Sequence, residues 1–306
     1  MPAPSLRPAT QRADSGLERV FLRGYWHMSR PQGLRIVRRM QRRSEALRIG
    51  ISGIGHQCRE HLAAVLQPWF DLRANSKHEI LISLAYGIFP EVYSLTQVNP
   101  DAPDGSLSSL REYLSERRID VLFVSPEPKY ECDLRTRTLP FLLRERIDLL
   151  WLLDLQDEIY SVNEILSIVD FIESHQKKVW FKVNFKNYAF SLDSYIEDFI
   201  VPRVWRARIP ASIRCFHYDN SITYEDGQKQ ESLPHCTIPR DVAFPKHLSW
   251  VGTPEYLKRK IRFQNLHYGI CSYKWDEERN CLQFNENYYL RLRRRPPEVH
   301  WELKHP

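Results

Sequence analysis

Residues Ile147 to Tyr160 read Ile-Asp-Leu-Leu-Trp-Leu-Leu-Asp-Leu-Gln-Asp-Glu-Ile-Tyr. The apolar run 149–153 has the length and continuity of a strand that is buried on both faces of a sheet. This run leads directly into three carboxylates, Asp154, Asp157 and Glu158. In open α/β sheets, ligands bind in the crevice outside the carboxyl ends of the strands. The stretch therefore predicts a buried strand that delivers acidic side chains to a ligand site.

The chemistry of these carboxylates favours a divalent metal ion. Carboxylate oxygens are ligands that Mn²⁺ and Mg²⁺ prefer, and such ions are usually held by a few carboxylates together with substrate phosphates. A second interpretation remains open from the spacing alone. Asp-rich turns after strands are common, and Asp154 or Glu158 would then cap a helix that begins near Ser161.

The composition is that of a globular protein. Of the 306 residues, 42% are hydrophobic and 12% aromatic, which excludes a disordered chain. No stretch approaches the roughly 18 uninterrupted apolar residues of a spanning helix, and no apolar signal segment follows the start. We therefore expect a soluble, cytoplasmic protein with no membrane span.

The six cysteines carry no Cys-x-x-Cys pair. They indicate reduced structural thiols, and neither a zinc site nor a disulfide framework. A pairing of Cys271 with Cys281 across a hairpin is the less favoured alternative.

The net charge of +6 is concentrated at the two ends of the chain. Residues 1–46 hold ten arginines and three carboxylates, a net charge of +7, so the remainder is mildly acidic. A second basic cluster, Arg291 and Arg293 to Arg295, lies in the tail 291–306. We interpret residues 1–46 as a flexible extension that is either a targeting segment or without a role, with polyanion contact through the Arg-rich ends as the alternative.

Strand and helix patterns alternate over residues 47–185. The predicted strands are 47–52, 78–85, 120–125, 149–153 and 179–185, and the predicted helices are 57–69, 106–118, 135–146 and 162–175. This order predicts a doubly wound sheet with parallel strands at its centre. Gly53 and Gly55 suggest a turn after the first strand that suits close approach of a nucleotide. Ser106 is the expected cap of the second helix.

The pattern changes after Phe185. Aromatic and polar residues mix, a hairpin is expected over 217–227, and helical periodicity returns only at 254–263. Such irregular segments often carry the acceptor side of a site on loops. We divide the folded part, 47–290, into a nucleotide-sugar half, 47–185, and an acceptor-side half, 186–290.

Four stretches resemble the family 2-like glycosyltransferases of the GT-A fold. They are Trp151 to Tyr160, Trp180 to Tyr188, Asp198-Phe199 with Pro202-Arg203, and Ser249 to Gly252. The resemblance covers most of 47–290 and implies a GT-A-type, Rossmann-like, mostly parallel sheet flanked by helices. It also implies a nucleoside-diphosphate sugar whose diphosphate is held by Mn²⁺ or Mg²⁺ on an Asp-x-Asp motif.

The acidic motif of this chain departs from that pattern. Two residues, Leu155 and Gln156, separate Asp154 from Asp157, where the familiar motif has one. By resemblance, Asp157 is the principal metal ligand and Glu158 a helper. Either Asp154 reaches around from the strand end, or one carboxylate suffices and metal binding is weak.

Several other residues are candidates for the same site. The resemblance implies a late histidine metal ligand, here His267, and places Ser52 and Gly53 at the donor. Lys186 and Arg203 are expected to neutralise the diphosphate or bind acceptor hydroxyls, or else to form ordinary ion pairs. Asp219, in an aromatic-flanked turn, is the candidate general base, with a role as an Asx-turn residue as the alternative.

Three functions remain open from the sequence. The first is a metal-dependent glycosyltransferase that acts on a saccharide or glycoconjugate acceptor. The second keeps that chemistry but modifies hydroxylated bases of DNA, which the Arg-rich ends favour and the acidic body disfavours. The third is a non-catalytic nucleotide- or polyanion-binding protein, which the irregular Asp154 and Asp157 spacing favours.

Overall fold

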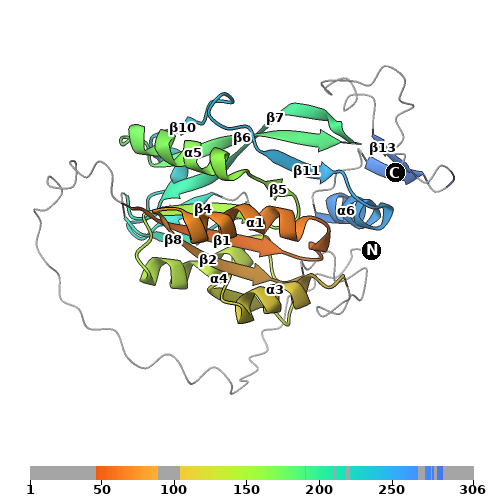
Figure 1. The fold of residues 1–306 in the computed structure, drawn as a ribbon, viewed down its shortest axis with the longest axis horizontal. Coiled ribbons are helices and arrows are strands. Elements are labelled where there is room, and N and C mark those ends of the chain that lie inside the picture. Colours follow the sequence, from red (N-terminus) through yellow and green to blue (C-terminus); the bar gives the residue numbers. More distant parts are fainter. Residues whose placement is uncertain are drawn as a thin grey trace, which may run out of the picture. The chain divides into compact units, whose positions relative to one another are not determined.

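The computed structural model of the chain describes residues 46–88, 104–189, 191–209, 211–217, 221–267, 273–276, 278 and 281–284 (Figure 1). The chain divides into two compact units, 1–45 and 46–306, and all described residues belong to the second. Asp219, Cys271 and the basic tail 291–306 lie outside the described residues. The predicted roles of both basic ends therefore stay predictions.

The first half of the described chain alternates strands with helices, as the sequence predicts. Its elements are β1 (Arg48–Gly55), α1 (Arg59–Asn75), β2 (Glu79–Tyr86), α3 (Ser106–Ser115), β3 (Val121–Val124), α4 (Glu131–Arg144), β4 (Leu149–Asp154), β5 (Glu158–Ile159), α5 (Val162–Ser174) and β6 (Trp180–Ala189). The residues of β4 before Asp154 are all fully buried, which confirms the strand at the centre of the prediction.

The second half is mostly strands. It comprises β7 (Ser191–Arg206), β8 (Ile213–Phe216), β9 (Ile222–Tyr224), a 3₁₀ turn η2 (Gln230–Ser232), β10 (His235–Thr237), β11 (Lys246–Trp250), α6 (Pro254–His267), β12 (Tyr273–Asp276) and β13 (Cys281–Phe284). The hairpin expected over 217–227 is formed by β8 and β9, which pair antiparallel.

Nine of these strands form one mixed sheet. Their order is β3-β2-β1-β4-β7-β6-β11-β5, and β10 pairs with β6 beside this path. The pairs among β3, β2, β1 and β4 are parallel, whereas β7 runs antiparallel to both of its neighbours. Three strands separate β4 from β5 in the sheet, but only residues 155–157 separate them in the chain. The sheet therefore curls, so that its far edge returns to the end of β4.

Two apolar layers cover the faces of this sheet. On one face α1, α3 and α5 pack against Ile51, Trp151 and their neighbours. On the other face α4 and the β8-β9 hairpin pack against Leu150, Leu152 and Trp205. Successive residues of β4 point alternately to the two layers, so a fully apolar strand sequence follows from burial on both sides. The doubly wound α/β architecture is confirmed (Figure 1).

Two local predictions are wrong. The Gly53–Gly55 segment continues β1 and is no turn, because a Cβ at Gly53 would lie 2.6 Å from Cδ2 of Leu84, so close packing selects glycine there. The N-cap of α3 is Gly105 at a φ of 79°, and Ser106 is the first helical residue. The strand β3 is only partly buried because it forms the edge of the sheet.

The alternative role of Asp154 or Glu158 as a helix cap is also wrong. Ser161 caps α5, and Glu164 completes a reciprocal capping box with it. Asp154 and Glu158 therefore do not cap α5. Among the described residues, no helix combines the length and the apolarity that a membrane crossing requires.

Candidate functional site

A topological switch point lies between β1 and β4. From β1 the chain proceeds to β2 and β3 on one side, and then returns to place β4 on the other side. The two strands are parallel, so their carboxyl ends lie together, with Ile54 opposite Asp154. Ligands of doubly wound sheets bind in the crevice at such a point. Across it, the Gln156 side chain donates a hydrogen bond of 2.8 Å to the carbonyl of His56.

His56 is the most unusual residue at the end of β1. Its side chain is only 6% exposed, and neither ring nitrogen has a hydrogen-bond partner among the described residues. Burial lowers its pKa to about 4, so the imidazole is neutral at pH 7 and offers one donor and one acceptor. The next residue, Gln57, has a φ of 47°, which a non-glycine residue rarely adopts. Unpaired polar groups and strained backbone of this kind concentrate at ligand sites.

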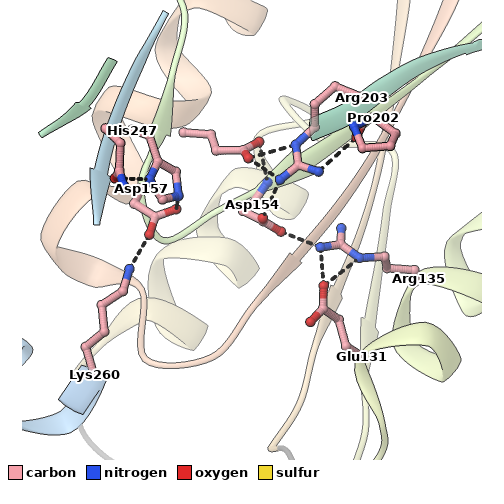
Figure 2. Close-up of polar contacts among 10 residues, drawn as sticks. Glu131, Arg135, Asp154, Asp157, Pro202, Arg203, His247 and Lys260 are labelled. Carbon is pink, nitrogen blue, oxygen red and sulfur yellow. Dashed lines mark hydrogen bonds and ion pairs between the residues drawn. The ribbon is translucent and has the colours of Figure 1, made fainter. Parts of the chain in front are cut away.

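The first charged group at this edge is the arginine cluster, formed by Glu131, Arg135, Asp154, Glu158 and Arg203 (Figure 2). Arg135 Nη2 lies 2.5 Å from Asp154 Oδ1 and also donates to Glu131. Arg203 Nη2 lies 3.0 Å from Asp154 Oδ2, and the same guanidinium donates two hydrogen bonds to Glu158. Both carboxylate oxygens of Asp154 thus contact arginines, one from α4 and one from β7.

The arginine cluster holds three carboxylates and two guanidinium groups. Burial raises the pKa of Glu158 to about 8, against the opposing effect of Arg203. Burial alone would also raise the pKa of Asp154, but Arg135 and Arg203 hold it below its usual range. Glu158 is fully buried, whereas the Asp154 side chain is 28% exposed. The cluster therefore retains its surplus proton on Glu158 and keeps Asp154 ionised.

The second charged group is the lysine cluster, formed by Asp157, Asn187, His247 and Lys260 (Figure 2). Asp157 Oδ2 accepts a hydrogen bond from Lys260 of α6, and its Oδ1 lies 3.3 Å from His247 Nε2. The other ring nitrogen of His247 lies 2.8 Å from Asn187 Oδ1. Burial alone would raise the pKa of Asp157, but His247 and Lys260 hold it far below its usual range.

The fold brings the lysine cluster together from distant segments. The amide of Leu248 donates to the carbonyl of Asp157, and Glu158 pairs with His247 in the β5-β11 ladder. Lys260 comes from the helix that follows β11, and its ammonium also lies 3.4 Å from the Tyr256 hydroxyl. The curl of the sheet is therefore what places α6 beside the end of β4.

The predicted metal ligands do not form a metal-binding set in this arrangement. All four oxygens of Asp154 and Asp157 contact cationic or imidazole side chains, and the two carboxylates turn toward different partners (Figure 2). Among the described residues, no group of three His, Cys, Asp or Glu side chains could hold an ion. His267 is the last residue of α6, and its side chain is not described.

The predicted donor residues lie in different surroundings. Ser52 Oγ is fully buried and lies 2.6 Å from Thr138 Oγ1 of α4. Gly53 faces Leu84 and Leu155 in the opposite layer. Lys186 of β6 lies over the Phe244 ring, with its ammonium 5.1 Å from the ring centroid. Their direct contacts with a ligand stay predictions, as does the base role of Asp219.

Sequence analysis missed His56, Arg135 and Lys260. His56 directly follows the first strand, and its position at a carboxyl end was the available signal. Arg135 and Lys260 lie on helices among many other basic residues, so no local pattern distinguishes them. Only the fold pairs them with Asp154 and Asp157.

The fold and the site define a mixed α/β protein with a topological switch point and two buried charge clusters. No family model and no curated protein matches the chain. Among solved structures it is similar to TarS of S. aureus, at 10% identity and a TM-score of 0.43, covering 76% of this chain and 41% of TarS.

Two shorter TarS structures are similar at comparable levels. The 1–349 structure has 9% identity and a TM-score of 0.42, covering 72% of this chain and 66% of that one. The same segment in complex with UDP has 10% identity and a TM-score of 0.37, covering 54% and 48%. The chain thus spans between 41% and 66% of the TarS chains. Likeness at these TM-scores assigns no function to this chain.

Proposed function

We propose that this chain binds a nucleoside-diphosphate sugar at the carboxyl ends of β1 and β4 and transfers the sugar to an acceptor hydroxyl. The observation that carries the proposal is the switch point itself. There, the imidazole of His56, which has no hydrogen-bond partner among the described residues, lies across the switch point from the carboxylate-bearing turn that follows β4. A buried imidazole that offers a donor and an acceptor at such a point suits a polar ligand with several hydrogen-bonding groups, such as a nucleotide.

The proposed reaction needs positive charge at the leaving group. Departure of the nucleoside diphosphate develops negative charge on its phosphate oxygens, which preorganised cations stabilise. Candidate cations are Lys260 and Arg259 of α6, because Lys260 contacts Asp157 and Arg259 is close enough to His56 to influence its charge. Mn²⁺ or Mg²⁺, bound by Asp154, Asp157 and His267, would supply the same charge, but the two aspartates are occupied by other side chains.

An inverting transfer also needs a base for the acceptor proton. We assign this role to Asp219, which lies outside the described residues and between β8 and β9 in the sequence. The flanking His217 and Ser221 are joined by a backbone hydrogen bond of 2.8 Å, and Phe216 N donates to Thr136 of α4. The hairpin is thus anchored to the helix that carries Arg135. Glu158 is fully engaged with Arg203, so we assign it the helper role of holding that arginine.

We favour a saccharide or glycoconjugate acceptor over DNA bases. The preference rests on the mildly acidic composition of the chain outside residues 1–46. Phosphate contacts come from Lys and Arg, so a DNA acceptor would require the basic ends. Loss of duplex DNA binding on deletion of residues 1–46 would favour the DNA acceptor.

A second candidate function is a non-catalytic nucleotide-binding protein. The specific observation in its favour is that both oxygens of each aspartate after β4 already contact a nitrogen of another side chain. Such a protein would bind the nucleoside diphosphate without turning over a nucleotide sugar.

The test combines binding and turnover on the full chain. We expect UDP, GDP, ADP or CDP to raise the melting temperature, because a ligand that binds only the native state stabilises it. We expect His56→Asn to weaken the binding of that nucleotide about tenfold, as the loss of one buried hydrogen bond would. His235→Asn, on an exposed residue of β10, is the matched control.

Three outcomes separate the candidates. Nucleotide binding together with release of nucleoside diphosphate from a nucleotide sugar supports the glycosyltransferase. Binding without release, across a panel of sugars and acceptors, supports the non-catalytic protein. Absence of binding by any nucleotide contradicts both.

A further inference from the structure

We infer that the chain binds its nucleoside diphosphate without a divalent metal ion, and that the ammonium of Lys260 supplies the positive charge at Asp157 that an ion would otherwise supply. The inference rests on the proposed function and specifies how its donor site is charged. It concerns α6, an element that the acidic motif alone does not indicate.

The carboxylates of Asp154 and Asp157 already have partners on both of their oxygens. Each of the four oxygens of Asp154 and Asp157 has its own nitrogen partner, from Arg135, Arg203, His247 and Lys260. The contacting side chains are at least nine-tenths buried. A divalent ion at these oxygens would lie beside cations that already contact them, and displacing such a buried cation would leave it unpaired, which is strongly unfavourable.

The two carboxylates also point in different directions. Asp154 points toward Arg135 on α4, whereas Asp157 points toward Lys260 on α6 (Figure 2). A Mg²⁺ ion demands near-ideal octahedral geometry with short oxygen contacts, so divergent carboxylates cannot share one. The extra residue between the two aspartates therefore turns their carboxylates toward different partners.

Lys260 is a buried lysine beside two aromatic rings. Its side chain is 7% exposed, and its ammonium lies 5.7 Å from the centroids of the Trp250 and Tyr256 rings. The ammonium contacts the Asp157 carboxylate directly, so the two opposite charges form a buried pair. An ammonium has three N–H donors, and Asp157 and Tyr256 account for two of them among the described residues.

Lys260 follows a second basic residue, Arg259, in α6. Its neighbour Arg259 is close enough to His56 and Cys58 to influence the charge of both. Lys260 thus contacts the turn after β4, while the charge of its neighbour Arg259 acts on the residues that follow β1. Two such cations are suited to a diphosphate at the switch point, because fixed charges in a water-poor site attract phosphate strongly.

The experiment is a titration of the full chain with the nucleoside diphosphate that raises its melting temperature most. Affinity is measured in EDTA, in Mn²⁺ and in Mg²⁺. We expect the three dissociation constants to agree within about threefold, and Lys260→Met to weaken binding in EDTA at least tenfold. Lys77→Met, on an exposed lysine between α1 and β2, is the matched control and should bind as the wild type does.

A second variant covers the case in which Lys260→Met fails to fold. The double variant Asp157→Asn/Lys260→Met removes both charges of the buried pair, and it should fold but bind weakly. Binding that requires Mn²⁺ or Mg²⁺ would overturn the inference and leave the proposed function intact. So would a folded Lys260 variant with wild-type affinity. Absence of nucleotide binding in all three conditions would overturn the proposed function as well.

Discussion

The arginine cluster and the lysine cluster both take carboxylates from the segment 154–158 but are built differently. The arginine cluster has more carboxylates than cations and joins α4, β4, β5 and β7. The lysine cluster has a single carboxylate between Lys260 and His247 and joins the end of β4 to β6, β11 and α6. A surplus of buried carboxylate indicates a structural network that retains a proton. The lysine cluster instead matches its one carboxylate with a lysine, and it is the group that we propose serves a ligand.

The largest expected effect comes from removing the central cation of the arginine cluster. Arg203→Met leaves Asp154 with one arginine and Glu158 with none, and breaking a buried pair in this way costs about 3–5 kcal/mol. We expect the free energy of unfolding, measured by urea denaturation, to fall by that amount.

Two companion variants sharpen this test. Arg208→Met, on an exposed residue after β7, should change stability by less than about 0.5 kcal/mol. The double variant Arg203→Met/Glu158→Gln should lose about as much as Arg203→Met, because Glu158 already holds a proton and the amide replaces one neutral group with another. A loss for Arg203→Met no greater than that for Arg208→Met would contradict the structural role of the cluster.

The next effect is a pH dependence specific to the arginine cluster. The folded state raises the pKa of Glu158 from 4.5 to about 8, so native Glu158 holds a proton that the unfolded chain has already lost. Its contribution to stability is present below pH 4.5 and is lost as the pH rises through about 8. Gln cannot ionise, so Glu158→Gln should lose less stability than the wild type between pH 6 and pH 8.5, by about 1 kcal/mol or more.

Urea denaturation at several pH values measures this difference. Glu112→Gln, on an exposed residue of α3, serves as the control and should follow the wild-type profile. Parallel profiles for the wild type and Glu158→Gln would show that Glu158 is ionised in the native state, against our assignment of the surplus proton.

The smallest expected effect lies in the lysine cluster. Asn187→Ala removes the hydrogen-bond partner of His247 Nδ1 but leaves the contact between Lys260 and Asp157 in place. We expect a loss of about 1 kcal/mol in the free energy of unfolding, the usual contribution of one hydrogen bond. Asn75→Ala, on the exposed last residue of α1, should lose less. A loss as large as that of Arg203→Met would show that the two clusters are equally structural.

Much of the fold was predictable because its strands are buried on both faces. The run 149–153 could only be a central strand, and the alternation up to Phe185 required crossovers that yield parallel pairing. The antiparallel insertion of β7 was not predictable, since it depends on a long ribbon with β6 that has no local signature. The turn predicted at Gly53 was wrong because glycine suits both a turn and a tightly packed strand.

The site was predictable only in part. The sequence indicated which carboxylates follow β4, but not what they contact. Arg135, His247 and Lys260 come from separate elements, between 19 and 103 residues away from their aspartate partners. A three-residue link from β4 to β5 decides this, because it requires the sheet to curl and bring α6 to the crevice. Curling is a property of the whole sheet and leaves no pattern in any one segment.

The most direct test of the account is a crystal structure of the full chain soaked with its best-binding nucleoside diphosphate in EDTA. We predict density for the ligand at the carboxyl ends of β1 and β4, with one of its polar atoms within hydrogen-bond distance of a ring nitrogen of His56. Ligand density elsewhere on the chain, with both ring nitrogens of His56 still unpartnered, would contradict the assignment of the site.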